Sequence, residues 1–436
     1  MRLISPSYRS SLLFVAGLCL AAGSAVAVDG GWKYQMRSGQ LALDLSQPEV
    51  LPLQAPRALT KADRAAAERA WRYIEANTRP ETGWVDSVAG YPSTTLWDQG
   101  SHLLALVAAE RLGIIDAGDF GARVDRLLSG FERLPLYDGK LPNKAYDTRS
   151  LQMVDYANQP TPEGIGWSAL DVARMLMAFR ALEKLDPVHG TRIRDLLARW
   201  DLPAMAMEGE LWGAKTEEGE VRYKQEGRLG YEQYGARAAA LWGLDVLQAT
   251  SARRALDWVE VAGVEVPADL RRADVFRAIT PILSEPYMLQ GLELGLDSET
   301  KLMAERVYLA QEARHRETGL ATMVSEDHIN QAPYFLYASV YANGAPWAVV
   351  TEKGEEHPEL RTLSVKATFA WDALYATDYT AMLRERIEGI GEADKGWPAG
   401  IYEADGALND IYTLNTNAIV LEAVHYMAHG PLWAIR

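Results

Sequence analysis

From about Lys61 to the end of the chain, long segments with helical spacing of apolar residues alternate with loops rich in glycine, proline and tryptophan. Within these segments the apolar positions recur at about every third or fourth residue, which is the period of an α-helix. Runs in which apolar and polar residues alternate are scarce, and the main exception is the stretch WVEVAGVEVP at 258–267. The pattern therefore predicts a mainly helical protein.

The predicted helices fall into pairs that differ in polarity. The first helix of most pairs is charged and amphipathic, whereas the second is apolar on nearly all sides, which is typical of a buried helix. A series of charged outer and apolar inner helices predicts an all-α fold, an (α/α)6 toroid with long loops at one face. The pairs are 61–77 with 94–113, 119–134 with 167–185, 189–200 with 231–247, 273–279 with 286–296, 298–315 with 362–377, and 379–390 with 411–429.

One loop sequence occurs twice in the chain. TRPETGWVDS at 78–87 and RHRETGLATM at 314–323 share Glu-Thr-Gly followed by a large apolar residue. Each copy lies where an outer helix is followed by the loop into an inner helix, and glycine can end a helix there. We therefore expect both copies at the same end of the toroid.

The N-terminal residues have the layout of a secretory signal. Basic Arg2 and Arg9 precede an apolar run at 12–22, and Ala25-Val26-Ala27 provides the small residues of a cleavage site. This pattern predicts a signal peptide over residues 1–27, and the apolar run is too short for a comfortable membrane span. No further membrane-spanning segment is expected.

The remainder divides into two parts. Residues 28–60, with three prolines, are expected to form an extended arm, and residues 61–436 the toroid. Cys19, the single cysteine, lies inside the signal, so the mature chain has no disulfide and no cysteine metal site. Export without disulfides favours a bacterial periplasm as the location.

Composition narrows the class of ligand. A formal net charge of -15 argues against nucleic acid or an anionic membrane as partner, because both require a basic face. The chain has 13 Trp and 20 Tyr but only 7 Phe, and Trp and Tyr combine a flat apolar face with a polar group. Such side chains suit the C–H faces of sugars. No nucleophile-elbow, phosphate-loop or metal motif is present, so neither a cofactor nor a metal is expected.

The loops that enter the inner helices combine carboxylates with aromatic residues. Glycosidic bond cleavage requires one protonated carboxyl that donates to the leaving oxygen and one ionised carboxylate that activates water or attacks. Several of these residues also have structural interpretations, since Asp98 and Asp171 match helix capping boxes and Glu232 can complement a helix dipole. The expected substrate-binding residues are Trp84, Trp97, Asp98, Trp167, Asp171, Trp212, Tyr231, Glu326, Asp327, Trp397 and Tyr402.

Five stretches of the chain resemble the bacterial family called domain of unknown function 3131, over roughly residues 62–430. That family is similar to glucoamylase-like and β-1,2-glucanase-like (α/α)6 enzymes, so the resemblance implies the same toroid. The stretches are ETGWVDSVAGYPSTTLWDQGSHLLAL, LPNKAYD, IGWSALDVARML, YEQYGARAAALWG and IYTLNTNAIVLEAVHY.

The resemblance also implies where an acid and a base would lie. In glucoamylase-like inverting enzymes the acid comes from the loop into the third inner helix and the base from the loop into the sixth. In this chain the acid is then Glu232, or failing that Glu210, and the base is Glu403 or Asp410. Neither loop reproduces a glucoamylase motif residue by residue. An inverting mechanism requires about 6.5–9.5 Å between the two carboxyl groups.

The sequence therefore predicts a periplasmic glycoside hydrolase of the inverting type that acts on a bacterial exopolysaccharide or periplasmic glucan. An exopolysaccharide synthesis or export system is the expected partner. Two alternatives stay open: a polysaccharide lyase on the same fold that uses Tyr or His as base, and a non-catalytic glycan-binding protein of an export system.

Overall fold

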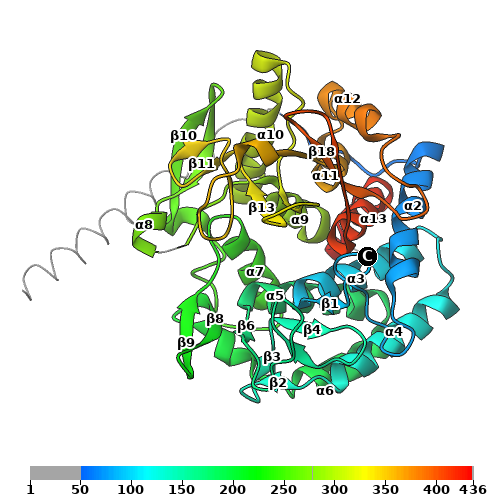
Figure 1. Ribbon diagram of the computed structural model, residues 1–436. Helices are drawn as coiled ribbons and strands as arrows, with labels where there is room; N and C mark the ends of the chain where they lie inside the picture. The colour runs from blue at the N-terminus through cyan, green and yellow to red at the C-terminus, as the bar shows by residue number, and fades with distance from the viewer. Residues whose placement is uncertain (1–50, 277, 435–436) are drawn as a thin grey trace, which may run out of the picture.

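Six inner helices form a closed ring in the computed structural model, which describes residues 51–276 and 278–434. Consecutive inner helices pack against one another, and the last packs against the first (Figure 1). The ring was expected because these segments are apolar on nearly all sides. The inner helices are α3 (Leu96–Arg111), α5 (Ala169–Leu185), α7 (Tyr231–Ala240), α9 (Ser284–Leu289) with the π-helical continuation η4 (Gln290–Leu294), α11 (Val365–Tyr375) and α13 (Leu414–His429).

Outer helices surround this ring at five of six positions. They are α2 (Lys61–Asn77), α4 (Ala117–Glu132), α6 (Gly190–Leu197), α10 (Ser298–Thr318) and α12 (Asp378–Ile387). At the fourth position a hairpin of β10 (Leu256–Val261) and β11 (Val264–Asp269) is followed by the short helix α8 (Ala273–Phe276). The predicted outer helix at 273–279 is thus wrong in extent, while the alternation at 258–267 was a correct sign of strand.

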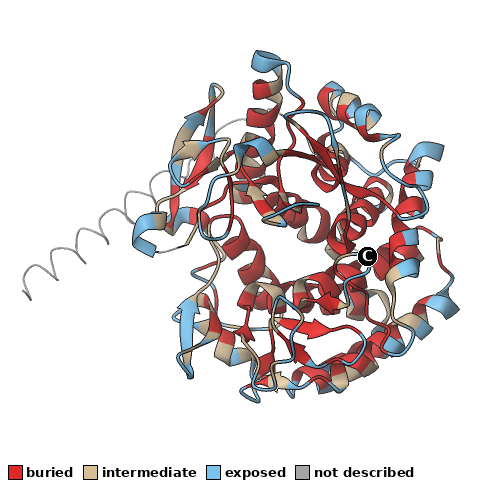
Figure 2. Cartoon of the chain, viewed as in Figure 1, coloured by how far each residue is buried: buried red, intermediate tan, exposed pale blue. Residues whose placement is uncertain are grey.

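Burial follows the predicted division between inner and outer helices. The inner helices are buried along nearly their whole length, whereas the outer helices expose their peripheral faces (Figure 2). In α3, for example, every residue from Asp98 to Ala109 is buried. The apolar pattern of these segments therefore indicates a helix that is enclosed on all sides, and not a surface helix with one buried face.

The loops at one face of the ring form small antiparallel sheets, so the all-α class is not confirmed. Long crossing segments must pair their backbone N–H and C=O groups, and short strands achieve this. The sheets have the orders β1-β4-β5, β6-β8-β7 with β9 on β8, β12-β13-β16 and β17-β18-β19, with the pairs β2-β3 and β14-β15. The strands are β1 (Ser93–Thr94), β2 (Leu136–Tyr137), β3 (Leu141–Pro142), β4 (Ala145–Asp147), β5 (Met153–Val154), β6 (Gly166–Trp167), β7 (Ala206–Met207), β8 (Glu210–Glu217), β9 (Glu220–Gln225), β12 (Glu326–His328), β13 (Phe335–Ala338), β14 (Tyr341–Ala342), β15 (Ala345–Pro346), β16 (Val349–Val350), β17 (Thr362–Ser364), β18 (Pro398–Tyr402) and β19 (Leu408–Tyr412).

The two Glu-Thr-Gly copies each follow an outer helix and precede the loop into an inner one. Gly319 ends α10 in the left-handed conformation, with φ of 72°, as the sequence predicted. The first helix of the other pair ends earlier, at Asn77, and Gly83 lies in the turn beyond it with φ of 74°. A Cβ at Gly83 would lie 2.8 Å from Arg126 Cγ, so close packing also requires glycine at that position.

The described end of the predicted arm runs along the inner helices. The backbone N–H of Gln54 donates to the carbonyl oxygen of Leu374 (2.8 Å), and that of Arg57 donates to Met427 (2.7 Å). The signal predicted at 1–27 and most of the arm predicted at 28–60 lie outside the described residues. Among the residues that are described, no helix has the length and apolar character needed to cross a membrane.

Charged side chains are buried on the axis of the ring. Arg174 of α5 donates to Glu293 Oε1 (2.6 Å) and to the Tyr234 hydroxyl (3.0 Å), and its other terminal nitrogen lies 3.4 Å from Glu422 Oε1. Arg174, Glu293 and Glu422 have no exposed side-chain surface. Burial, followed by the charge of Glu293, raises the pKa of Glu422 well above its ordinary value. Glu422 therefore keeps its proton, and one arginine balances one carboxylate.

We predict that Arg174→Met lowers the free energy of unfolding by about 3–5 kcal/mol, because removal of one partner leaves the other charge buried and unpaired. Urea denaturation measures this loss. Arg194→Met is the matched control: Arg194 is 58% exposed in its pair with Glu183, and such pairs contribute about 0–1 kcal/mol. Equal losses in both variants would contradict the prediction.

Candidate active site

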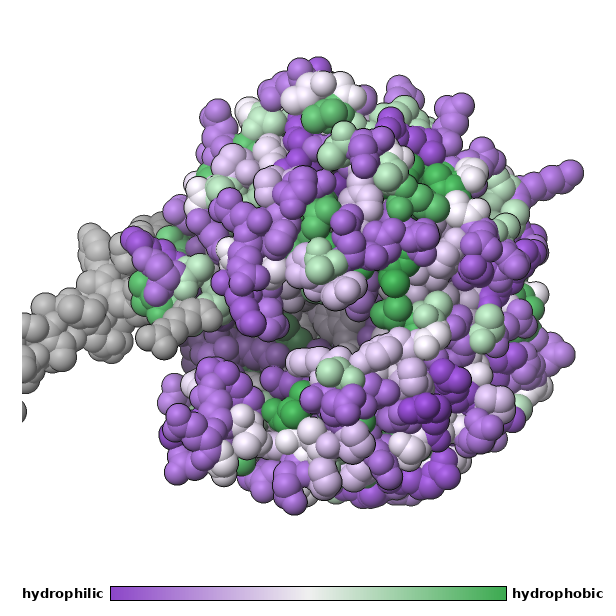
Figure 3. Space-filling model, viewed as in Figure 1, coloured by the Kyte–Doolittle hydropathy of each residue, from purple (hydrophilic) through white to green (hydrophobic). Residues whose placement is uncertain are grey.

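The face of the ring that carries the loops is hollowed near its middle (Figure 3). The inner helices begin at this face, since each outer-to-inner loop leads into the N-terminus of an inner helix. Parallel helix N-termini carry partial positive charge and favour carboxylates. The acidic residues that gather here are therefore in an environment that suits their charged form, while burial opposes it.

A buried ion pair lies at the start of two inner helices. Lys366 Nζ of α11 pairs with Glu285 of α9 and lies 3.6 Å from Asp327 Oδ1. The same Glu285 accepts hydrogen bonds from Asn415 Nδ2 (2.7 Å) and from Ser325 Oγ (3.2 Å). These contacts fix the position of the Glu285 carboxylate. This arrangement places one lysine among several carboxylates.

Polar contacts continue from this ion pair to the buried arginine on the axis. Asn415 Oδ1 of α13 accepts from Ser101 Oγ of α3 (3.2 Å), and Ser101 Oγ accepts from Arg174 Nε (3.0 Å). The floor of the hollow and the axis of the ring therefore form one connected network. A change of position in one inner helix must alter the network that holds the others.

Glu326 and Asp327 have pKa values raised into the neutral range. Burial raises the pKa of Glu326 to about 8, assisted by the charge of Glu285 and opposed by Lys366. Burial also raises the pKa of Asp327 to about 7, with Lys366 as the main opposing charge. Glu326 is half-buried and Asp327 buried, so Glu326 is the more accessible of the two. It can hold a proton at neutral pH and present it to a ligand.

A second group of carboxylates lies at the starts of α3 and α5. Burial, followed by the charge of Glu226, raises the pKa of Asp171 to about 7. The Ser168 hydroxyl donates to Asp171 (2.9 Å) and accepts the backbone N–H of Asp171 (3.1 Å). Asp98 accepts from the hydroxyls of Ser87 (2.6 Å) and Thr95 (3.0 Å), and burial raises its pKa. Both aspartates are thus helix-cap partners, as their sequence pattern indicated, and both also belong to the carboxylate group of the hollow.

Tyr337 connects the two groups. Burial, followed by the charges of Glu326 and then Glu352, Tyr156 and Asp171, raises the pKa of Tyr337 well above its ordinary value. Tyr337 of β13 stands opposite Glu326 in the sheet register. In Figure 1, β13 and α5 lie on opposite sides of the centre of the ring. Asp171 and Glu326 therefore both lie near enough to Tyr337 to raise its pKa.

Trp97 is the predicted tryptophan that lies at the axis. Its half-buried ring packs edge-on against Tyr231 at a centroid distance of 5.9 Å and lies 5.8 Å from Tyr234, with the Arg174 guanidinium 4.8 Å from the ring. The indole N–H of Trp97 has no hydrogen-bond partner in the described part of the chain. Half-buried Trp97 therefore supplies aromatic surface near the carboxylates, whereas the predicted Tyr231 is buried, with 8% of its surface exposed.

Three of the other predicted tryptophans are core residues, which contradicts their expected exposure. Trp84 and Trp167 are 0% exposed and Trp397 is 4% exposed. The indole N–H of Trp167 donates to the carbonyl oxygen of Trp212 (3.0 Å), and that of Trp397 donates to Ala66 (3.0 Å). Their apolar area is needed for packing between loops and helices. Trp212 is half-buried, but it lines a different cavity from the axial hollow.

Glu232 does not face the axis. Its Oε2 pairs with Arg271 Nη2 (2.8 Å), and its Oε1 accepts from Gln225 Nε2 (3.0 Å). It lines an off-axis cavity with Trp212. Burial raises its pKa, with Arg271 as the main opposing charge. The predicted raised pKa is therefore present, but the carboxyl points away from the hollow.

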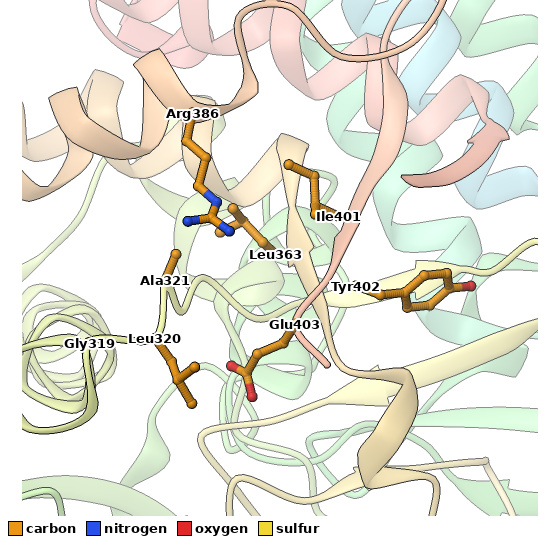
Figure 4. Close-up of a pocket in the computed structure, with 8 residues that line it drawn as sticks. All are labelled: Gly319, Leu320, Ala321, Leu363, Arg386, Ile401, Tyr402 and Glu403. Carbon is orange, nitrogen blue, oxygen red and sulfur yellow. The ribbon is translucent and has the colours of Figure 1, made fainter. Parts of the chain in front are cut away.

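Glu403 lies in a second, small pocket. Arg314 and Arg361 both pair with its carboxylate, the latter at 2.7 Å. Burial acts to raise the pKa of Glu403, but the two arginines outweigh it and lower the pKa. The pocket has a volume of about 70 Å³, far below the roughly 300–1,000 Å³ of ligand pockets. Figure 4 shows the Glu403 carboxylate and the Tyr402 ring pointing in opposite directions from the end of β18.

One asparagine, Asn330, contacts two predicted site residues of the β18–β19 hairpin, Tyr402 and Asp410. Asn330 accepts from the Tyr402 hydroxyl (2.7 Å) and donates to the exposed Asp410 (2.6 Å). Glu232 and Glu403 line different pockets that share no residue. The structure thus places Glu232 and Glu403 in separate pockets, and the surroundings of Glu232, Glu403 and Asp410 give their catalytic roles no support.

Sequence reasoning missed several residues of the hollow. Glu285 lies at the start of α9, one residue before the predicted inner helix 286–296, and Lys366 lies at the start of α11, within the predicted inner helix 362–377. Charges inside otherwise apolar helices are seldom buried unless they are paired, so these two carried a usable signal. Tyr337 lies in a stretch for which the sequence predicted no functional role. For it the sequence held no stronger signal.

Within the described ranges, no group of His, Cys, Asp and Glu is arranged to hold a metal ion.

The ring and its loop face define an (α/α)6 toroid. The chain belongs to the family described as "Protein of unknown function (DUF3131)", whose model matches residues 65–430. A Bacteroides fragilis protein provisionally described as a glucoamylase is similar in structure, with a TM-score of 0.63 and 11% identity over 89% of this chain and 95% of that one.

Two endo-β-1,2-glucanases have the same fold. The enzyme from Chitinophaga pinensis, in complex with sophorotriose and glucose, has a TM-score of 0.60 and 12% identity over 86% of this chain and 94% of that one. The enzyme from Talaromyces funiculosus, in complex with sophorose, has a TM-score of 0.57 and 13% identity over 83% of each chain. No curated protein matched the sequence.

Trp167→Ala is expected to lower the free energy of unfolding by about 3–5 kcal/mol, because it removes a fully buried aromatic side chain and leaves a cavity. Thermal and urea denaturation measure the loss. The same change at half-buried Trp212 is the control and should cost less. A Trp167→Ala protein with unchanged stability would show that this ring is not a core residue.

Proposed function

We propose that the protein is a glycoside hydrolase that cleaves a glucan in the axial hollow, with Glu326 as general acid. The observation that carries the proposal is a pair of half-buried carboxyls, Glu326 and Asp171, that both act on the pKa of Tyr337 and have pKa values of about 8 and 7 themselves. Glycosidic cleavage requires one carboxyl that is protonated and one that is ionised. The higher pKa assigns the proton to Glu326 and the charge to Asp171.

In this mechanism Glu326 donates its proton to the glycosidic oxygen as the bond to the anomeric carbon breaks. Asp171 removes a proton from the water that attacks the anomeric carbon from the other side, which inverts its configuration. Lys366 lies within reach of Glu285 and Asp327, and its charge opposes the rise in the pKa of Glu326 and of Asp327. At Asp171 the rise in the pKa is opposed by the Ser168 hydrogen bond and by the charge of Lys144.

Aromatic residues around the carboxyls favour a sugar as the ligand. Trp97, packed on Tyr231, offers ring surface at the floor, and Tyr156, 65% exposed, offers it in the loops above. The fold shared with enzymes that act on β-1,2-glucan favours a glucan as the polymer. A β-1,2-linked glucan is therefore the first substrate to test.

The cellular setting rests on the N-terminal sequence. The pattern of residues 1–27 supports export, and we propose that the mature enzyme acts in the periplasm, on a periplasmic glucan or on an exopolysaccharide during its synthesis or export. Acidic polymers are disfavoured by the net charge of -15. Cleavage of the protein after residue 27 is measurable by N-terminal sequencing of the exported form.

Glu326→Gln is expected to lower kcat by about 10²–10⁴-fold, because the amide keeps size and hydrogen bonding but has no transferable proton. The assay is release of reducing ends from β-1,2-glucan and from other bacterial glucans. Glu392→Gln is the matched control, since Glu392 is exposed and pairs with Lys395 at the surface. Near-normal turnover of Glu326→Gln would remove Glu326 from the acid role. Unsaturated products would instead indicate a lyase, and binding without cleavage a glycan-binding protein.

The pH profile of kcat/KM is expected to be bell-shaped. Activity rises through an apparent pKa near 7, because Asp171 must lose its proton to act as base, and falls through an apparent pKa near 8, because Glu326 must keep its own. Asp171→Asn should abolish the rising limb and Glu326→Gln the falling limb in whatever activity remains. A profile that is highest under acidic conditions would contradict both assignments.

A further inference from the structure

The off-axis cavity that Trp212 and Glu232 line is on the outer side of α7. Its volume is about 650 Å³, which is within the roughly 300–1,000 Å³ of small-molecule sites. The β8–β9 hairpin forms one wall, and Phe276 of α8 lies on another. The hollow in Figure 3 extends from the middle of the face toward this side, above the residues of β8 and β9.

Aromatic and amide side chains share one face of the β8–β9 hairpin. Trp212 stands directly opposite Gln225 in the register, and Tyr223 is two residues before Gln225, so the three side chains project to the same side. Tyr223 is 41% exposed. The cavity thus has a flat apolar wall with an amide group beside it, which is a surface that suits a sugar ring.

Arg271 pairs with Glu232 (2.8 Å), and Arg254 pairs with Glu210 (2.8 Å). Lys224 and Arg228 also line the cavity, and two carboxylates beyond the lining, Glu217 and Asp269, pair with Lys224 and Arg271. The ion pairs keep acceptors and donors in the lining, which sugar hydroxyls can use. Arg228 donates to Gln225 Oε1 (2.8 Å), and its Nε has no hydrogen-bond partner in the described part of the chain.

We propose that this cavity is a distal binding site for a neutral sugar unit of the same polymer that is cleaved at the axis. A chain held both at the axis and in the cavity spans the hollow, so long glucans bind more tightly than short ones. Trp212 is therefore a substrate-binding residue, as the sequence indicated, but at a distance from the carboxyls. Glu232 contributes to the same distal site rather than to proton transfer. The proposal rests on the glycan substrate of the proposed function.

The test measures binding rather than turnover. In a Glu326→Gln background, isothermal titration gives the Kd for long β-1,2-glucan and for the trisaccharide sophorotriose. Trp212→Ala is expected to raise the Kd for the long glucan roughly tenfold, the scale of one lost aromatic contact, and to leave the trisaccharide bound at the axis nearly unaffected. Trp258→Ala is the matched control, because Trp258 is half-buried on the neighbouring hairpin and does not line the cavity.

Each outcome decides the proposal. A selective loss for the long glucan in Trp212→Ala, absent in Trp258→Ala, supports the distal site. Equal Kd values in parent and Trp212→Ala for both ligands overturn it, as does an equal loss for both ligands, which would show an effect on the fold. Tighter binding of a uronic acid polymer than of the neutral glucan also overturns it. Because no turnover is required, a failure of hydrolysis leaves this test intact.

Discussion

Burial of charged side chains on the axis is the constraint on which the rest of the structure depends. Each inner helix contributes a polar side chain to one connected network, and a buried charge that loses its partner costs several kcal/mol. The six helices are therefore held in a fixed order and at a fixed depth. The members of the network are Ser101 of α3, Arg174 of α5, Tyr234 of α7, Glu285 of α9, Glu293 of η4, Lys366 of α11, and Asn415 and Glu422 of α13.

The same constraint sets the chemistry of the hollow. Parallel helix N-termini attract carboxylates to the loop face, and burial together with mutual repulsion raises their pKa values into the neutral range. Lys366 limits the rise in the pKa values of the carboxyl groups beside it, because its ammonium group favours their charged forms. A site that holds both a protonated and an ionised carboxyl near neutral pH follows from this balance.

Two consecutive residues at the start of α7 face two different pockets. Tyr231 and Glu232 are consecutive residues of α7, so their side chains diverge by about 100° around the helix. Tyr231 packs against Trp97 at the axis, whereas Glu232 pairs with Arg271 in the off-axis cavity. The start of α7 therefore supplies residues to both the hollow and the cavity.

The sequence by itself determined the ring, because a helix that is apolar on all sides must be enclosed, and it placed Trp97, Asp171 and Glu326 among the site residues. Most strands of the loop face have only two or three residues and carry no readable period, so most of these strands could not be predicted. Tertiary structure alone decided which acids meet. The helical step that turns Glu232 away from the axis, and the arginines that pair with Glu403, depend on contacts between segments far apart in the chain.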